Sequence, residues 1–283
     1  MAAWNKLAII AGGGELPVLL AAHLAAQGAD FWIARIAHYA DPALDSYPGA
    51  TFNIGEMGGR IAAMKAAGCD AVALIGIVRR PDLAQVKFDE YGLTLLPRLA
   101  DAARQGDDAL LRVLVGSLEE AGLSVIGAEA AFEGLLATAG AYGAHAPDER
   151  ALRDIAKAAR VADALNAWDV GQAIVVCDGL VLAVEAQEGT DAMLARTAML
   201  AEEVRGSQAA RRGVLLKRPK PNQERRVDLP TIGVRTIEGA ARAGLAGVAI
   251  EAGGALIARR EDVIARADAL GVFVYGFTAA DLA

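Results

Sequence analysis

The feature that most limits the fold of this chain is the alternation of short apolar runs with helical segments in its first half. It begins with KLAIIAGGGELP, residues 6–17, which has the form of a buried strand, a glycine turn and a helix start. Further strand-like runs are FWIARIA from residue 31, AVALIGIV from residue 71 and LSVIGA from residue 123. Helical sequence separates these runs, so we predict an α/β fold with a Rossmann-like parallel sheet and helices on both faces.

The second half of the chain has a different pattern. Apolar runs flank Asp178-Gly179, which is a strong hairpin signal. LAGVAIEAGGALIAR, residues 245–259, is predicted to be another strand pair that turns at Gly253-Gly254. These hairpins, with helices around them, predict a mixed α/β domain.

The stretch LLATAGAYGAHAPDE, residues 135–149, separates the two patterns. It is rich in small residues and ends near a proline. We therefore predict a Rossmann-like N-terminal domain over residues 1–141, a linker over residues 142–147, and a C-terminal domain over residues 148–283.

The composition and charge of the chain limit the kinds of partner and metal ligand that we expect. The chain has 28 Lys and Arg against 35 Asp and Glu, a net charge of −7, so we expect no nucleic-acid partner. Cys69 and Cys177 border apolar runs, which is typical of reduced thiols in a cytoplasmic protein. His23, His38 and His145 form no metal-spaced pair, so oxygen ligands are expected for any metal. No signal peptide is evident at the start of the sequence.

The strongest positive charge lies in KRPKPNQERRVD, residues 217–228, which has five basic side chains, two acids and two prolines. A solvated loop is the usual explanation of such a run. The residue types also suit phosphoryl chemistry. Lys217, Lys220 and Arg226 are candidates to neutralise a diphosphate, and Asp228 is a candidate to bind magnesium or orient a water molecule.

Two turns at predicted strand ends are candidate phosphate contacts. Gly12, Gly13 and Gly14 suit a purely structural turn, a phosphate or sugar-nucleotide contact, or a nicotinamide cofactor, although Pro17 takes the third glycine position of a dinucleotide fingerprint. Arg80, in GIVRRPD, suits a phosphate as well as it suits a solvated turn.

Acidic residues occur at two predicted helix starts, where helix capping and binding of a phosphate with its magnesium are the alternative explanations. Asp107 and Asp108 are explained by helix capping alone. Glu188, Thr190 and Asp191 crowd another helix start, where Thr190 is expected to cap the helix. Capping does not require all three, so this cluster is a candidate site for a phosphate and its magnesium.

Six motifs occur in order along the chain: AGGGELP, GIVRRPD, GDDALL, VEAQEGTDAML, KPNQERRVDLPTIG and GLAGVAIEAGG. From residue 6 to about residue 276, the series resembles the magnesium-dependent UDP-2,3-diacylglucosamine pyrophosphatases of bacterial lipid A synthesis, the LpxI type. The glycine turn is weakly specific. The pair EGTDAML and KPNQERRVDLPTIG is highly specific.

The resemblance implies hydrolysis of UDP-2,3-diacylglucosamine to UMP and 2,3-diacylglucosamine 1-phosphate. It implies two domains that hold the lipid between them, at the cytoplasmic face of the inner membrane. Asp228 matches the essential acid of the family, and Thr190 and Asp191 match its GTD signature. Glu224 stands where many members have aspartate, which bears on metal preference if that position binds the metal.

These observations give a set of candidate residues. The catalytic candidates are Asp228, Gln223 and Arg226, and the metal candidates are Asp228 and Asp191, for Mg²⁺ with Mn²⁺ as a substitute. The substrate-binding candidates are small or carry a hydrogen-bond donor: Gly12, Gly13, Gly14, Arg80, Thr190, Lys217 and Lys220.

Two other functions stay open from the residues themselves. One is a sugar-nucleotide or phospho-sugar enzyme without an acyl pocket, and the other is a non-catalytic nucleotide-binding regulator. For the pyrophosphatase we expect a lipid-linked sugar nucleotide as substrate, an apolar cleft between the domains, and peripheral contact with the inner membrane surface. A second copy of the chain, in a homodimer, is a further candidate partner.

Overall fold

The computed structural model describes residues 4–79, 81–165, 168, 170–221 and 223–282. The chain divides into two compact units. The N-terminal unit comprises Met1–Gly134 and Glu224–Asp228, and the C-terminal unit comprises Leu135–Gln223 and Leu229–Ala283. We call Glu224–Asp228 the inserted segment, because it joins the N-terminal unit from late in the sequence.

The division falls earlier in the chain than the linker expected at residues 142–147. Strand β6 (Gly140–Tyr142) explains the difference, because it pairs antiparallel with β13 (Phe273–Phe277), with Tyr142 opposite Val274. The small-residue stretch is therefore an edge strand of the C-terminal sheet, and the chain passes from one unit to the other at Gly134 and Leu135.

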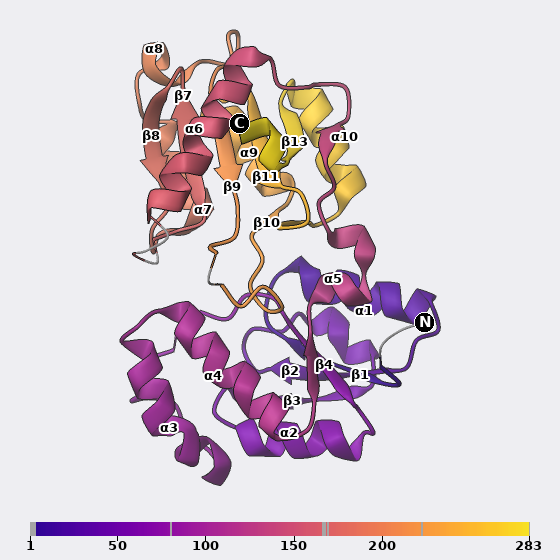
Figure 1. Ribbon diagram of the computed structural model, residues 1–283. Helices are drawn as coiled ribbons and strands as arrows, with labels where there is room; N and C mark the ends of the chain where they lie inside the picture. The colour runs from indigo at the N-terminus through magenta and orange to yellow at the C-terminus, as the bar shows by residue number, and fades with distance from the viewer. Residues whose placement is uncertain (1–3, 80, 166–167, 169, 222, 283) are drawn as a thin grey trace. The chain divides into compact units, whose positions relative to one another are not determined.

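The N-terminal unit is built on a five-stranded sheet in which all neighbours are parallel, as the sequence predicted (Figure 1). In spatial order the strands are β3 (Gly49–Phe52), β2 (Phe31–Ile36), β1 (Leu7–Ala11), β4 (Ala71–Ile75) and β5 (Ser124–Ile126). The two central strands are apolar throughout, because helices cover both faces of the sheet. The strand order reverses between β1 and β4, which is where open α/β sheets bind ligands.

Helices connect these strands. They are α1 (Glu15–Ala26), α2 (Met57–Ala66), α3 (Glu90–Ala103), α4 (Asp107–Glu120) and the short α5 (Ala128–Ala131), with 3₁₀ turns η1 (Pro42–Ser46) and η2 (Glu133–Leu135). Met64 of α2 and Leu118 of α4 pack against Ala8 and Ile10 of β1 on one face of the sheet. Helix α1 lies on the other side of the sheet (Figure 1).

The C-terminal unit has a mixed sheet of six strands. In spatial order they are β6, β13, β11 (Gly247–Glu251), β9 (Val214–Lys217), β7 (Ala173–Cys177) and β8 (Leu180–Val184). One face packs against α6 (Glu149–Leu165). The other packs against α7 (Gly189–Thr197), α9 (Val234–Arg242) and α10 (Arg260–Leu270). This unit also contains α8 (Glu202–Arg205) and the 3₁₀ turn η4 (Ala279–Leu282).

One of the two predicted hairpins is confirmed. Strands β7 and β8 are antiparallel and turn at Asp178-Gly179, where φ is 49° and 78°. Positive φ at both central residues is the type I′ conformation that matches the twist of a hairpin. The amides of Asp178 and Gly179 donate to the buried Asp154 of α6 at 2.9 and 2.7 Å, which fixes the turn against the helix.

The prediction of a strand pair that turns at Gly253-Gly254 is wrong. Strand β11 lies between β9 and β13 and is parallel to both, while β12 (Leu256–Ile257) pairs in parallel with β10 (Thr231–Ile232) in a separate sheet. The backbone explains the departure, because the Gly253 amide donates to Ala137 O at 2.8 Å and leads the chain away from β11.

Candidate functional site

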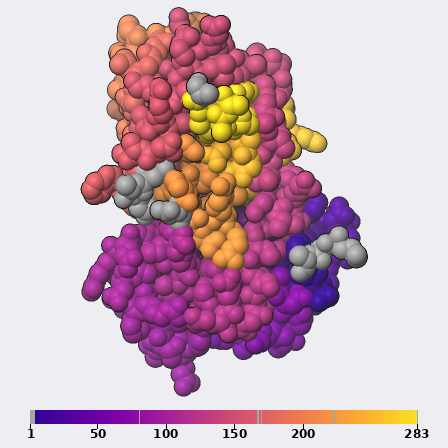
Figure 2. All heavy atoms as spheres, in the orientation of Figure 1, coloured from indigo at the N-terminus to yellow at the C-terminus, as the bar shows by residue number. Residues whose placement is uncertain are grey.

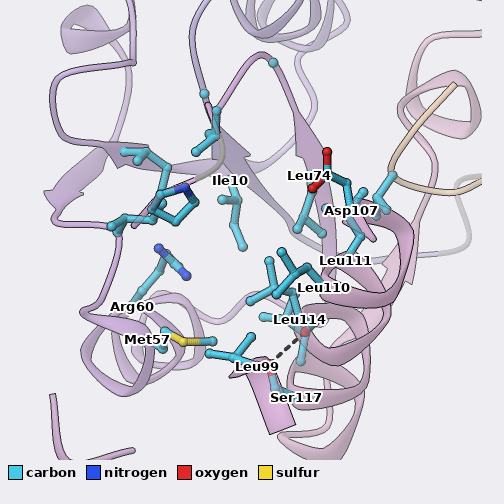
Figure 3. Close-up of a pocket in the computed structure, with 18 of the residues that line it drawn as sticks. Ile10, Met57, Arg60, Leu74, Leu99, Asp107, Leu110, Leu111, Leu114 and Ser117 are labelled. Atoms are coloured by element: carbon cyan, nitrogen blue, oxygen red, sulfur yellow. Dashed lines mark hydrogen bonds between the residues drawn. The ribbon is translucent and has the colours of Figure 1, made fainter. Parts of the chain in front are cut away.

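A cavity of about 460 Å³ lies at the carboxyl end of the parallel sheet in the N-terminal unit. Its walls come from the ends of β1, β2 and β4, from α2, α3 and α4, and from the inserted segment. Figure 3 shows Leu110 and Leu114 of α4 and Leu99 of α3 pointing toward Ile10 of β1. The volume suits a small-molecule site, and the mainly aliphatic walls suit an apolar ligand.

The two ends of the cavity differ in burial. Ile77, which follows β4, is 67% exposed, and Arg79 beside it is exposed as well. Met57 and Leu99 on the helices are only 3% and 4% exposed. The cavity therefore runs from an accessible rim into the core of the unit. All of its lining residues belong to the N-terminal unit, and the apolar cleft expected between the domains stays a prediction.

The glycine turn lies at this rim and is tightly built into the fold. The Gly12 amide donates to Ile75 O and the Gly13 amide to Ile77 O, both at 2.9 Å, so these two donors are committed to the backbone. A Cβ atom on Gly12 would stand 2.9 Å from the carbonyl carbon of Gly76. Gly14 has a φ of 86° and precedes α1. Close backbone approach thus accounts for Gly12 and Gly13, and a substrate contact at the turn stays a prediction.

The inserted segment is anchored to α4. The Glu224 amide donates to Asp108 Oδ1 at 2.7 Å, and Arg226 Nη1 donates to Glu119 Oε1 at 2.7 Å. Val227 packs into the core on the same side of the sheet. These contacts give Asp108 an anchoring role, whereas its neighbour Asp107 lines the cavity.

Charge pairing within the inserted segment is strong. Hydrogen bonds from the Arg226 guanidinium hold the pKa of Glu224 below its usual value, and the same bonds raise the pKa of Arg226. Both groups are therefore ionised at neutral pH. The fork of Arg226 binds carboxylates in this structure, so its predicted contact with a diphosphate stays a prediction.

Asp228 ends the inserted segment and lines the cavity with Gly12 and Asp107. Its amide donates to Glu224 O at 3.2 Å, which closes a turn. The turn places the carboxylate predicted to be catalytic at the wall of an apolar cavity, next to the carboxyl ends of the strands. This juxtaposition is the main feature that the fold adds to the sequence.

The other candidates in the basic run belong to the C-terminal unit. Lys217, at the end of β9, is 8% exposed, and its Nζ donates to Thr231 O at 2.9 Å. Lys220 and Gln223 form a turn in which the Lys220 amide donates to Gln223 Oε1 at 2.9 Å. The basic run is thus partly structural, since Lys217 and Gln223 are both buried.

The GTD signature lies at the start of α7. Glu188, and not Thr190 as predicted, is the residue at the helix cap, and the Thr190 hydroxyl donates to Glu185 Oε1 at 2.6 Å. That hydrogen bond draws the Thr190 side chain toward Glu185, which directly follows β8. Asp191 accepts from Arg235 Nη2 at 2.6 Å, and both side chains are largely exposed.

The fold brings together some of the candidates. Gly12, Gly13, Gly14, Arg226 and Asp228 share the N-terminal unit, where Gly12 and Asp228 line one cavity. The candidates in the C-terminal unit are Thr190, Asp191, Lys217, Lys220 and Gln223. Arg80 lies outside the described residues.

The carboxylates can be tested for fit to magnesium. In the part of the chain that the structure describes, no three His, Cys, Asp or Glu side chains cluster into a metal site of their own. Magnesium on phosphate substrates is usually held by one or two carboxylates together with the phosphate oxygens. Asp228 and Asp107 line the same cavity and fit that arrangement, whereas Asp191 is paired with Arg235 in the C-terminal unit.

Within the described ranges, no helix has both the length and the apolar character needed to cross a bilayer.

Both units match family models. The LpxI N-terminal domain matches residues 6–135, and the LpxI C-terminal domain matches residues 138–275. The chain belongs to the LpxI family. A relative from Caulobacter vibrioides, UDP-2,3-diacylglucosamine pyrophosphatase LpxI, is 53% identical over 272 residues, which cover 96% of this chain and 97% of the relative. The family resemblance seen in the sequence is thereby confirmed.

Sequence reasoning missed a buried charged residue of this LpxI-family cavity, Arg60. Arg60 lines it from α2, where Met57, Arg60 and Met64 are the buried residues. Their spacing, i, i+3 and i+7, marks one face of a helix. The sequence signal that could have identified Arg60 is a single arginine on the otherwise apolar face formed by Met57 and Met64.

Proposed function

We propose that this LpxI-family chain hydrolyses the diphosphate of UDP-2,3-diacylglucosamine, giving UMP and 2,3-diacylglucosamine 1-phosphate in lipid A biosynthesis. The observation that carries the proposal is the 53% identity, along nearly the whole of both chains, to the pyrophosphatase from Caulobacter vibrioides. The cavity supports it independently, since it joins an aliphatic interior to a rim that bears carboxylates and arginine.

The aliphatic interior is the proposed place for an acyl chain of the substrate. Each methylene that leaves water contributes about 0.8 kcal/mol, so even one long chain dominates affinity. The sugar and diphosphate are polar and belong at the exposed end, near Asp228, Asp107 and Arg79. An acyl chain seated in this way brings the diphosphate to the carboxylates.

Asp228 is the proposed catalytic carboxylate. Its turn and the anchoring of Glu224 on Asp108 hold it at the cavity wall, where it orients the attacking water or a magnesium ion. Magnesium, when bound, supplies positive charge to the diphosphate oxygens. Water attack forms one P–O bond as the P–O bond of the anhydride breaks, and UMP and the lipid phosphate separate.

Residues of the C-terminal unit complete the proposed set. Lys217, Lys220 and Gln223 are proposed to contact the phosphate groups, and Thr190 and Asp191 to contact the substrate and its metal. We further propose that the enzyme works at the cytoplasmic face of the inner membrane, as a peripheral protein, with a homodimer as one candidate state.

Hydrolysis assays test the function. We expect turnover of UDP-2,3-diacylglucosamine with magnesium, loss of turnover in EDTA, and recovery when magnesium or manganese is added back. UDP-N-acetylglucosamine, which lacks long acyl chains, should be a substrate worse by several orders of magnitude. Equal turnover of both substrates supports a general sugar-nucleotide enzyme instead, and binding without any turnover supports a regulator.

A further inference from the structure

The carboxylate of Glu185, which directly follows β8, joins the GTD signature to the start of the basic run. Its Oε1 accepts from the Thr190 hydroxyl at 2.6 Å, and its Oε2 accepts from the Gln172 amide at 3.0 Å. The three residues are half-buried. Because both oxygens are engaged, the carboxylate is held in one orientation beside Thr190.

Gln172 connects this carboxylate to the basic run, which is partly exposed at the surface, as the orange atoms of Figure 2 show. The carbonyl oxygen of Gln172 accepts from the Arg218 amide at 3.2 Å. The Arg218 side chain is held as well, with Nε donating to Glu251 Oε2 at 3.0 Å and Nη1 to Asp163 Oδ1 at 2.9 Å. One series of hydrogen bonds therefore runs from the GTD signature, through Glu185, to the residue that follows β9.

The direction of the Thr190 hydrogen bond limits what its hydroxyl offers to a ligand. A threonine hydroxyl has one proton and two lone pairs, whereas a carboxylate has only acceptor positions. The proton is therefore committed to Glu185, and the lone pairs of Oγ1 are the part that a ligand meets. A hydroxyl in this state accepts hydrogen bonds and cannot donate to a phosphate oxygen, which is itself an acceptor.

The charges around this hydroxyl favour the same conclusion. Glu188 is paired with Arg196 at 3.0 Å, and Asp191 with Arg235 at 2.6 Å. Glu185 accepts instead from a hydroxyl and a backbone amide, which carry no charge to offset its own. A phosphate oxygen at Oγ1 would stand beside that negative charge and be repelled by it.

We propose that Glu185 is a positioning residue that fixes Thr190 as a hydrogen-bond acceptor for the substrate. Thr190 then binds a neutral donor of the sugar nucleotide, a hydroxyl or N–H group of its sugar or nucleoside, and the phosphates are bound by the basic run. The inference rests on the proposed function, in which Thr190 contacts the substrate, and it adds the polarity of that contact.

Glu185→Gln tests this polarity with almost no change of shape. The backbone amide of Gln172 only donates, so the new amide oxygen must face it and the new NH₂ group must face Thr190. The threonine oxygen then accepts from that group, and its own proton turns outward. A contact that needs an acceptor is lost, and we expect kcat/KM for UDP-2,3-diacylglucosamine to fall roughly tenfold, mainly through KM.

The opposite polarity gives the opposite result. A Thr190 hydroxyl that donates to a phosphate oxygen would be freed by Glu185→Gln, so kcat/KM would stay level or rise. Either of these outcomes would overturn the proposal.

A double-variant series shows whether Glu185 acts through Thr190. Thr190→Val removes the hydroxyl and keeps the branched shape, and we expect it to lose about as much activity as Glu185→Gln. Thr190→Ser keeps the hydroxyl and should retain most of the activity. In the Thr190→Val background, Glu185→Gln should lower kcat/KM no further, because a positioning residue acts through the group that it positions. Losses that multiply in the double variant would contradict the proposal.

Glu238→Gln is the matched control. It makes the same chemical change in the C-terminal unit, at a carboxylate on α9 that accepts from Arg266 Nε at 2.9 Å. It should leave kcat/KM unchanged. Thermal unfolding of each variant checks the fold, and loss of the cooperative transition in Glu185→Gln would assign the carboxylate to the fold and overturn the proposal.

A binding measurement separates this inference from the proposed reaction. The shift in Tm caused by UDP-2,3-diacylglucosamine requires no turnover. Absence of hydrolysis, with a Tm shift that Glu185→Gln reduces and Glu238→Gln does not, would refute the proposed reaction and retain the role of Glu185. Normal hydrolysis that Glu185→Gln leaves unchanged would refute the role of Glu185 and leave the reaction untouched.

Discussion

Arg226 binds the carboxylate of Glu224 through two parallel hydrogen bonds, Nε to Oε1 and Nη2 to Oε2, each 2.8 Å long. Bidentate pairs of this kind combine charge with a fixed geometry. The third arm, Nη1, donates to Glu119 at the end of α4. Because the two residues precede Asp228 in one short segment, the pair holds the segment that brings Asp228 to the cavity.

Arg226→Lys tests whether this pair acts by geometry or by charge alone. If Arg226 positions Asp228, lysine cannot reproduce the fork, and we expect kcat to fall roughly tenfold or more, nearly as far as in Arg226→Met. If its role is to supply positive charge to a diphosphate, Arg226→Lys should retain most activity. Steady-state kinetics of Arg226→Lys and Arg226→Met distinguish the two roles. The double variant Glu224→Gln/Arg226→Met adds a second test: if the two residues act together, its kcat should be no lower than that of either single variant.

Glu224 should make stability depend on pH. Its pKa in the folded protein is held below the ordinary 4.5 by the hydrogen bonds from Arg226. Because its folded pKa is lowered, ionised Glu224 makes its full contribution to the free energy of unfolding above pH 4.5. That contribution is lost as the pH falls through the lowered folded pKa. The difference in urea stability between the unmodified protein and Glu224→Gln should therefore be largest near neutral pH and shrink below pH 4.5. A difference that grows on acidification would contradict the pairing.

Asp228→Asn separates chemistry from folding. The side chain keeps its size and loses its charge, so we expect kcat to fall at least about a hundredfold. The Tm should change little, because the turn is made by the backbone amide of Asp228. Mass spectrometry of the purified variant should detect uncleaved substrate. Near-normal turnover, or loss of the cooperative thermal transition, would remove Asp228 from the catalytic set.

Gly12→Ala tests how tightly the glycine turn is packed. A Cβ atom there would stand 2.9 Å from backbone atoms of Gly76 and Ile77, and forced overpacking typically costs about 1–3 kcal/mol. We expect a clear loss of thermal stability. Gly59→Ala is the control, since the nearest side-chain atom, Asp89 Oδ2, is 3.9 Å away and the residue is helical. Equal thermal stability of the two variants would show that the turn accommodates a Cβ atom at Gly12, contrary to this prediction.

Filling the cavity should impair use of the acylated substrate. Leu114→Trp adds bulk to the cavity wall on α4, and we expect kcat/KM for UDP-2,3-diacylglucosamine to fall about tenfold or more, mainly through KM. Leu93→Trp, at a leucine of α3 that is 56% exposed, is the control and should have little effect. Unchanged KM in a folded Leu114→Trp variant would place the acyl chain elsewhere.

Local patterns predicted much of the fold. The helix predicted to start at Asp107 and Asp108 is α4 (Asp107–Glu120), and the apolar run from Ala71 is β4. Helix α3 was not expected, because Gly92 and Pro97 interrupt its sequence and read as breakers. Asp89 compensates by capping its start, with Oδ1 accepting from Gly92 N at 2.8 Å.

The sequence by itself determined the alternation of strands and helices, the hairpin at Asp178 and the family, because these depend on residues close together in the chain or on motifs read in order. Only the tertiary structure decided that Glu224–Asp228 belongs to the N-terminal unit. The contacts responsible join Glu224 to Asp108 and Arg226 to Glu119, across separations of 116 and 107 residues. Periodicity carries no information about partners so distant, since a hydrogen bond of this kind forms only after the sheet and α4 have packed.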